Sequence, residues 1–359
     1  MHLIQTRQEF TNLISDLSKH DVIAIDTEFL RDKTYYPQFC LLQIATQNKA
    51  YAVDALSEEV DFTLLKDLLI NESVTKVFHS CKQDVEILCK AIGVMPNNIF
   101  DTQVAAAFCG ISDMPSYDFL CRKLLNKNID KTQRVTDWSM RPLRDNQIKY
   151  ALNDVIYLIE IYKKLSANLE KDRKKSWALE YMKNFSNEDY FKLDADQVWQ
   201  RLTMPQIPFK AKHAFKIIAI WREQKSIEYN IPRRKFLSDN DMINISLFLT
   251  GVNKNKPDNK IFAEYSDQIK SFLEEFSKNN NEGYLTKKIM NVKQRNDYKL
   301  LKNLLSLKAK ESNIARHLVA RNYDLSDLIF LKNFDENICT RGWRKEIYGN
   351  FAIQILQNK

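Results

Sequence analysis

Two carboxylates two positions apart, Asp26 and Glu28, come at the end of the apolar run 22–29. The side chains of a strand alternate between its two faces, so both carboxylates would point the same way. Hard divalent cations such as Mg²⁺ and Mn²⁺ prefer oxygen ligands, and a pair of this kind is suited to bind one. The sequence therefore indicates a metal site at the end of this strand.

Further side chains that could contribute to this metal site lie on predicted helices. Asp84 and Glu86 are also two apart, but such positions on a helix do not face each other, so at most one of them belongs to the site. Asp84 lies nearer to the end of the preceding strand. Tyr150 and Asp154 are four apart on one helix and project from the same face. Each motif is weak alone, and their order along the chain carries the prediction.

The elements that must position these residues alternate over the first 190 residues. Strand signals and helical periodicity interleave there, which predicts a mixed sheet with helices on its faces. The strands are expected at 22–29, 40–46, 50–55 and 74–80, and the helices at 62–70, 83–93 and 146–165. Beyond residue 190 the chain reads as helices, among them 210–230, 266–278 and 342–357, with a linker at 279–283.

Composition restricts the class of protein. The 359 residues are 44% hydrophobic and 28% charged, as in globular proteins, and this length predicts two or three domains. The six glycines show no phosphate-cradle spacing and the six cysteines no C-x-x-C, which argues against a glycine-loop nucleotide site and a zinc site. We find no membrane-spanning stretch and no secretory signal, so we expect a cytoplasmic protein without a membrane partner.

The formal charge of +8 is unevenly distributed. Residues 1–120 carry −8, residues 121–190 carry +5 and residues 191–359 carry +11. An acidic front with a basic rear fits a protein that binds metal at one place and a polyanion around it. The alternative is a solvated surface on which the asymmetry arose by chance.

Five segments, in order across 130 residues, resemble the bacterial ribonuclease D family. Residues 26–43 resemble its first exonuclease motif and 79–84 its second. Residues 100–103 are similar to a segment that follows, 137–143 to the stretch before the third motif, and 150–154 to the third motif itself. The resemblance implies an RNase H-like exonuclease of the DEDD group, in the branch with tyrosine in the third motif.

The resemblance also implies a domain organisation. It predicts an α/β RNase H-like exonuclease domain over 1–190, with a mixed sheet flanked by helices and a connecting helix at its end. Two small all-α domains of the HRDC type, which bind nucleic acid, would follow over 191–280 and 281–359. The first of these rests on similarity at 198–202 and 217–239, and the second partly on position in the chain.

The family's active site, carried to the matching positions, implies two Mg²⁺ or Mn²⁺ ions bound by Asp26, Glu28, Asp84 and Asp154. Tyr150 would orient the attacking water through its neutral hydroxyl. This implies 3′→5′ hydrolysis of structured RNA to 5′-mononucleotides, with 3′-extended tRNA precursors as substrate and no obligatory protein partner. Two alternatives remain open: a DNA-directed exonuclease of the same fold, and a non-catalytic RNA-binding protein with a degenerate nuclease domain.

Basic residues near these motifs are candidate RNA contacts. Arg141 and Arg144 lie just before the helix that carries Tyr150, where they could hold substrate phosphates. A second group crowds the predicted helix 210–230 and the turn after it, and its phosphate contacts would be independent of sequence. Its members are Lys212, Lys216, Arg222, Lys225, Arg233 and Arg234. The alternative for this group is an ordinary charged helix face.

Overall fold

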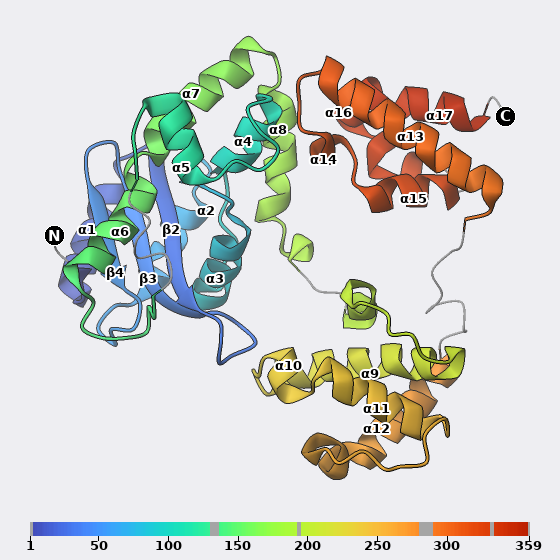
Figure 1. Ribbon diagram of the computed structural model, residues 1–359. Coiled ribbons are helices and arrows are strands. Elements are labelled where there is room, and N and C mark those ends of the chain that lie inside the picture. The colour runs from blue at the N-terminus through green and yellow to red at the C-terminus, as the bar shows by residue number, and fades with distance from the viewer. Residues whose placement is uncertain (1–2, 130–135, 192–194, 280–289, 331–333, 358–359) are drawn as a thin grey trace. The chain divides into compact units, whose positions relative to one another are not determined.

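The computed structural model describes residues 3–129, 136–191, 195–279, 290–330 and 334–357, and it divides into two compact units (Figure 1). The sheet unit comprises Met1–Phe29, Phe39–Tyr190 and Lys288–Lys359, and the helical unit comprises Leu30–Gln38 and Phe191–Lys287. Within the described ranges, no helix is long and apolar enough to cross a membrane.

Six strands in the described part of the chain form one sheet in the order β1-β4-β3-β2-β5-β6. Their bounds are β1 Leu3–Ile4, β2 Val22–Leu30, β3 Gln38–Ala45, β4 Ala50–Asp54, β5 Thr75–Phe78 and β6 Ile99–Asp101. β3 and β4 are antiparallel, whereas β1/β4, β2/β5 and β5/β6 are parallel. The mixed sheet is therefore confirmed, and the short edge strands β1 and β6 are additions to it.

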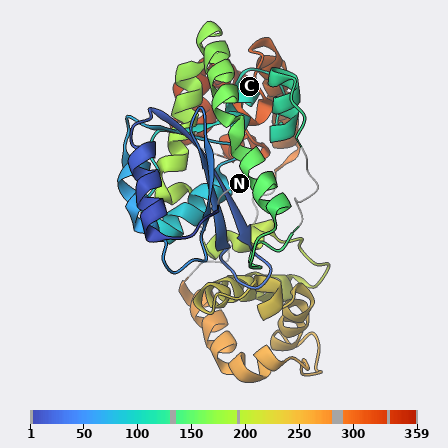
Figure 2. The same ribbon diagram turned by 90° about the vertical axis from the view of Figure 1, so that its left-hand side faces the viewer.

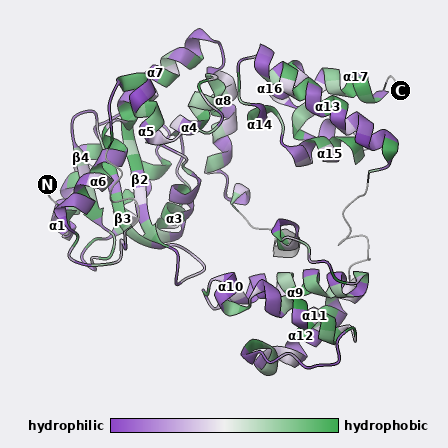
Figure 3. Ribbon diagram, viewed as in Figure 1, coloured by the Kyte–Doolittle hydropathy of each residue, from purple (hydrophilic) through white to green (hydrophobic). Residues whose placement is uncertain are grey.

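Helices cover both faces of the sheet (Figure 2). They include α1 Arg7–Leu17, α2 Lys66–Ile70, α3 Lys82–Ile92, α4 Thr102–Phe108, α5 Tyr117–Leu120 and α8 Lys175–Met182. Apolar residues concentrate along the strands and on the helix faces that cover them (Figure 3). Ile23, Ala24 and Ile25 of β2 are buried, which is typical of a strand packed on both faces.

The helix predicted over 146–165 is in fact two helices, α6 Asp145–Ile156 and α7 Leu158–Lys171. In a regular helix the Tyr157 amide would donate to the Asn153 carbonyl. Instead the Tyr117 hydroxyl donates to the Asn153 carbonyl at 3.0 Å and accepts from the Tyr157 amide at 3.2 Å. A side chain inserted into the hydrogen-bond ladder explains the break.

The last helices of the chain pack within the sheet unit. They are α13 Val292–Glu311, α14 Arg316–Val319, α15 Asn322–Phe330, α16 Gly342–Arg344 and α17 Asn350–Gln357, with a π-helical turn at Lys345–Gly349 that interrupts the helix predicted over 342–357. Trp343 stacks on Trp177 with ring centroids 5.5 Å apart and meets Phe108 edge-on at 5.3 Å. The buried Lys174 ammonium donates to the Phe108 and Asn313 carbonyls at 3.2 and 2.9 Å. The last helices thus bury aromatic surface on the sheet unit, while the three-domain division remains a prediction.

The helical unit is built around α9 Phe209–Glu228, with α10 Arg233–Phe236, α11 Asp239–Leu249, α12 Lys260–Asn279 and the 3₁₀ segment η5 Ala195–Arg201. Its core includes Phe215, Trp221, Met242 and Phe262. Residues 30–38, the connection between β2 and β3, belong to this unit. The Tyr35 amide donates to the Asn230 carbonyl at 3.1 Å, which ties this connection to the end of α9. Residues 280–283 of the predicted linker lie outside the described residues.

Candidate active site

Three of the predicted acids converge at the middle of the sheet. Asp26 and Glu28 leave the same side of β2, which lies between β3 and β5, and Asp154 comes from α6. One carboxylate oxygen of each lies within 4.8 Å of the others. Three oxygen donors at this spacing fit a hard divalent cation such as Mg²⁺ or Mn²⁺.

Asp84 lies beside these three acids and is hydrogen-bonded to β2, the strand that carries Asp26 and Glu28. Its carboxylate accepts from the Thr27 amide at 3.1 Å and from the Thr27 hydroxyl at 2.6 Å. It also occupies the first turn of α3, where the helix dipole stabilises negative charge. Thr27 lies between Asp26 and Glu28 on β2 and thus fixes the position of Asp84 on α3.

The turn before α3 is fixed by another carboxylate. Ser80 has a left-handed φ of 62°, and the Asp101 carboxylate accepts from the Ser80 and Cys81 amides at 3.2 and 2.8 Å. Asp101 also caps α4 by accepting from the Gln103 and Val104 amides. One buried acid therefore sets the start of two helices, including the one that carries Asp84.

The clustered acids perturb one another's proton affinity. Burial raises the pKa of Asp26 well above its ordinary value, and the negative charges of Asp84, Asp154 and Glu28 raise it further. Burial, followed by the charges of Asp154 and Asp84, raises the pKa of Glu28 to about 9. Burial raises the pKa of Asp84 to about 7, although its bonds to Thr27 oppose the shift. A bound cation would offset this repulsion, which is a second reason why the cluster fits a metal.

Tyr150 lies one turn before Asp154 on α6 and is half-buried. Its ring centroid lies 6.1 Å from that of the buried Trp138, which packs beside it. Because Tyr117 breaks the helix just after Asp154, it helps to set the direction of the segment that carries both residues. The supporting roles of Tyr117 and Thr27 cannot be inferred from local sequence, because their partners lie 36 and 57 residues away along the chain.

The structure argues against the predicted RNA contact of Arg141. Its guanidinium binds both oxygens of Asp54 and donates to the carbonyls of Trp138, Met140 and Cys40, so all five of its N–H groups are used. Arg141 therefore joins three parts of the fold. Arg144 is exposed at the start of α6 and donates through its Nε to Gln147 at 3.2 Å.

The prediction of a basic face on α9 is wrong for Arg222. Its side chain is 2% exposed and donates to the Leu237 carbonyl at 2.9 Å and to Asp239 at 2.7 Å. The spacing of residues on a helix tells which of them share a face but not whether that face is buried, and much of α9 is. Lys216 lies over the Trp199 ring at 4.3 Å, and Lys225 bonds Glu228 at 2.8 Å.

The remaining predicted contacts differ in exposure. The Lys212 side chain is half-buried. Arg233 is paired with the buried Glu223 at 2.6 Å. The Arg234 side chain is 81% exposed and also pairs with Asp239, at 3.2 Å. Of this group, Arg234 is thus the residue most open to a partner, and RNA binding by the others stays a prediction.

A mixed sheet that presents clustered acids, with helices on both faces, defines the RNase H-like class of 3′–5′ exonuclease domains. Residues 1–170 match the family described as a 3′-5′ exonuclease. The whole chain has closer relatives. It is 31% identical to the ribonuclease D of Bartonella henselae over 100% of this chain and 91% of that protein. It is 33% identical to the ribonuclease D of Nitrobacter hamburgensis over 99% of this chain and 95% of that protein.

The fold is similar to the crystal structure of Escherichia coli RNase D, described as an exoribonuclease involved in structured RNA processing. The TM-score is 0.84 at 24% identity, over 99% of this chain and 98% of that one. The chain belongs to the ribonuclease D family of 3′–5′ exoribonucleases. The fold class and the family inferred from the sequence motifs are both confirmed.

Proposed function

We propose that this exoribonuclease trims the 3′ ends of structured RNA, with 3′-extended tRNA precursors as substrate, and releases 5′-mononucleotides. The observation that carries the proposal is the convergence of Asp26, Glu28 and Asp154 within 4.8 Å, with Asp84 beside them. The relatives' activity on RNA supports an RNA substrate over DNA. The cytoplasmic location expected from the sequence is part of the same proposal.

Each proposed catalytic residue has a role that its surroundings support. Asp26, Glu28, Asp84 and Asp154 would hold two Mg²⁺ or Mn²⁺ ions. When bound, such ions activate the attacking water and stabilise the leaving 3′ oxygen. Asp26, Glu28 and Asp154 would supply oxygen ligands to these ions, and Asp84 would support them from the first turn of α3. Tyr150 would hold the attacking water by a hydrogen bond from its neutral phenol.

The HRDC-type assignment of the helical regions is proposed together with this function. Residues 191–359 carry +11 of the charge and would hold the RNA body while the 3′ end enters the site. Arg144, Lys212, Lys216, Lys225, Arg233 and Arg234 remain proposed contacts, whereas Arg141 and Arg222 are used by the fold.

The test is digestion of a 3′-extended tRNA precursor, with product lengths read at single-nucleotide resolution. We expect stepwise shortening with Mg²⁺ or Mn²⁺, release of 5′-mononucleotides, and no cleavage in EDTA. Asp26→Asn should abolish cleavage. Glu86→Gln should retain it, because Glu86 lies on α3 but outside the acidic group formed by Asp26, Glu28, Asp84 and Asp154. Faster degradation of a matched DNA tail, or full activity of Asp26→Asn, would contradict the proposal.

A further inference from the structure

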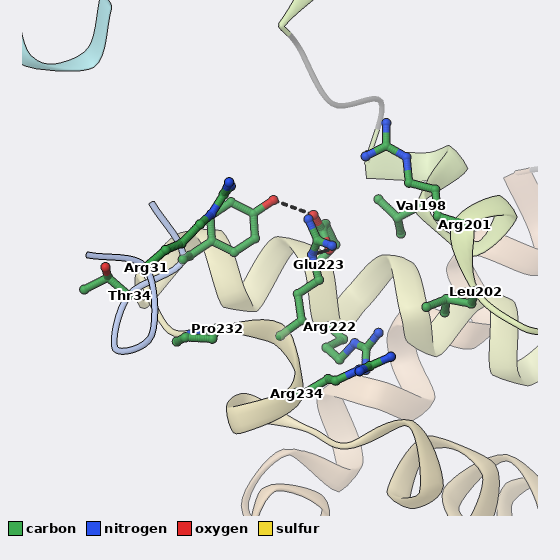
Figure 4. Close-up of a pocket in the computed structure, with 11 residues that line it drawn as sticks. Arg31, Thr34, Val198, Arg201, Leu202, Arg222, Glu223, Pro232 and Arg234 are labelled. Carbon is green, nitrogen blue, oxygen red and sulfur yellow. Dashed lines mark hydrogen bonds and ion pairs between the residues drawn. The ribbon is translucent and has the colours of Figure 1, made fainter. Parts of the chain in front are cut away.

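A cavity of about 590 Å³ in the helical unit is lined largely by arginines (Figure 4). Four segments contribute to it: the 30–38 connection, the end of η5, α9 and the start of α10. Arg31 and Arg201 approach it from opposite sides, with Arg222 and Arg234 along a third wall (Figure 4). Its size is within the range of about 300–1,000 Å³ that is usual for ligand sites.

The charges around the cavity do not balance. Five arginines line it, the fifth being Arg233, and the one acidic side chain in the lining is Glu223. Glu223 is 1% exposed and already accepts from the Tyr35 hydroxyl and pairs with Arg233. Asp239 in turn is shared by Arg222 and Arg234. Two carboxylates thus face five guanidinium groups, which leaves the cavity positively charged.

Arg31 and Arg201 carry two of these three excess positive charges. Both are exposed, and within the described chain neither has a hydrogen-bond or ion-pair partner. The planar guanidinium group pairs with phosphate through two parallel hydrogen bonds, more specifically than an ammonium does. Two such groups on opposite sides of one cavity therefore suit a phosphate group.

The connection that carries Arg31 follows the catalytic strand directly. Arg31 is three residues after Glu28, and three residues of extended chain span at most about 11 Å. The connection is anchored by the Tyr35–Glu223 hydrogen bond and by the Tyr36 amide, which donates to the Asn230 side chain at 3.1 Å. Chain connectivity therefore limits how far Arg31 can lie from Glu28.

We propose that this arginine pocket binds a phosphodiester group of the RNA strand, within a few nucleotides of the cleaved end, through Arg31 and Arg201. The inference rests on the proposed RNA-trimming function and adds a binding site to it. Neither arginine stands out in the sequence, because Arg31 lies within the motif segment 26–43, where the acids carry the chemistry, and Arg201 is a single charge before a loop.

The experiment measures binding of a fluorescent single-stranded RNA to the full-length protein carrying Asp26→Asn, over a series of salt concentrations. Arg31→Gln with Arg201→Gln is compared with Lys254→Gln with Lys256→Gln, two exposed charges of the same unit outside the cavity. Single strands give a salt slope of about 0.7 for each phosphate contacted, and the two arginines share one phosphate, so we expect the arginine pair to reduce the slope by about 0.7. The lysine pair should leave it unchanged.

Two further outcomes would overturn the proposal that this pocket binds a phosphodiester group of the RNA. Equal effects of both pairs would mean that only general charge matters. If inorganic phosphate raises the melting temperature in an Arg31- and Arg201-dependent manner while the RNA salt slope is unaffected, the pocket takes a free anion instead. Failure of the proposed function would appear separately, as absent EDTA-sensitive RNA cleavage by the unmodified enzyme, whatever the binding result.

Discussion

Replacement of Glu28 by Gln should stabilise the metal-free protein above neutral pH. The pKa of Glu28 is raised from 4.5 to about 9 in the folded protein. Above pH 4.5 the unfolded chain has released this proton while the folded protein still holds it. The unfolded state therefore binds fewer protons, and stability falls as pH rises from about 4.5 to about 9.

The size of the effect follows from this interval. At about 1.36 kcal/mol per unit, the 2.5 units between pH 4.5 and pH 7 correspond to about 3 kcal/mol of lost stability at pH 7. For a domain the size of the sheet unit, a loss of about 3 kcal/mol lowers the melting temperature by roughly 6–12 °C. The raised pKa of Asp26 acts in the same direction. Glu28→Gln removes one titrating group and part of the repulsion on the others.

The assay is thermal unfolding in EDTA between pH 6 and pH 8, with Glu86→Gln as the matched control. We expect the melting temperature of the unmodified protein and of the control to fall with pH, and that of Glu28→Gln to fall less and lie higher at pH 8. Mg²⁺ or Mn²⁺ should restore stability to the unmodified protein and much less to Glu28→Gln. A flat or rising profile for the metal-free unmodified protein would refute the electrostatic reasoning.

Three other substitutions test how the site is supported. Tyr117→Phe removes the hydroxyl that bridges α6 and α7, so we expect a loss of about 1–3 kcal/mol in urea unfolding and weaker metal-dependent cleavage; unchanged values for both would show that the bridge is dispensable. Asp54→Asn should destabilise the protein by roughly 3 kcal/mol in urea unfolding, because it leaves Arg141 without its charge partner; unchanged stability would show that the fold does not depend on this pair. Trp343→Ala should cost about 3–5 kcal/mol in the unfolding of the sheet unit; a normal melting temperature would mean that the last helices do not support it.

The central part of the fold and the acidic group were predictable because their signals are local. An apolar run that ends in D-x-E specifies a buried strand with two carboxylates on one side, and β2 has this form. Gly93, with a left-handed φ of 81°, ends α3 where the sequence indicates. The edge strands β1 and β6 have two and three residues, too few for any periodic pattern.

The errors arose where distant residues decide the local structure. Nothing within 146–165 reveals the helix break, because the hydroxyl that causes it belongs to Tyr117. Likewise Arg222 and Lys225 share a face by their spacing, yet Arg222 is buried because Leu237 and Asp239 lie against it. The 30–38 connection joins the helical unit through Asn230, a contact almost 200 residues away in sequence.

The acidic group is kept together by contacts that are independent of any metal. Asp26 and Glu28 are fixed by an interior strand, Asp84 by two hydrogen bonds from Thr27, and Asp154 by a helix whose end is set by Tyr117. Like charges brought together in this way oppose folding, as the raised pKa values of Asp26 and Glu28 show. The surrounding fold must therefore supply the free energy that holds these half-buried carboxylates close to one another. Because that cost is met on folding, a cation meets preformed ligands, and substitutions that relieve the repulsion should gain stability at the expense of cleavage.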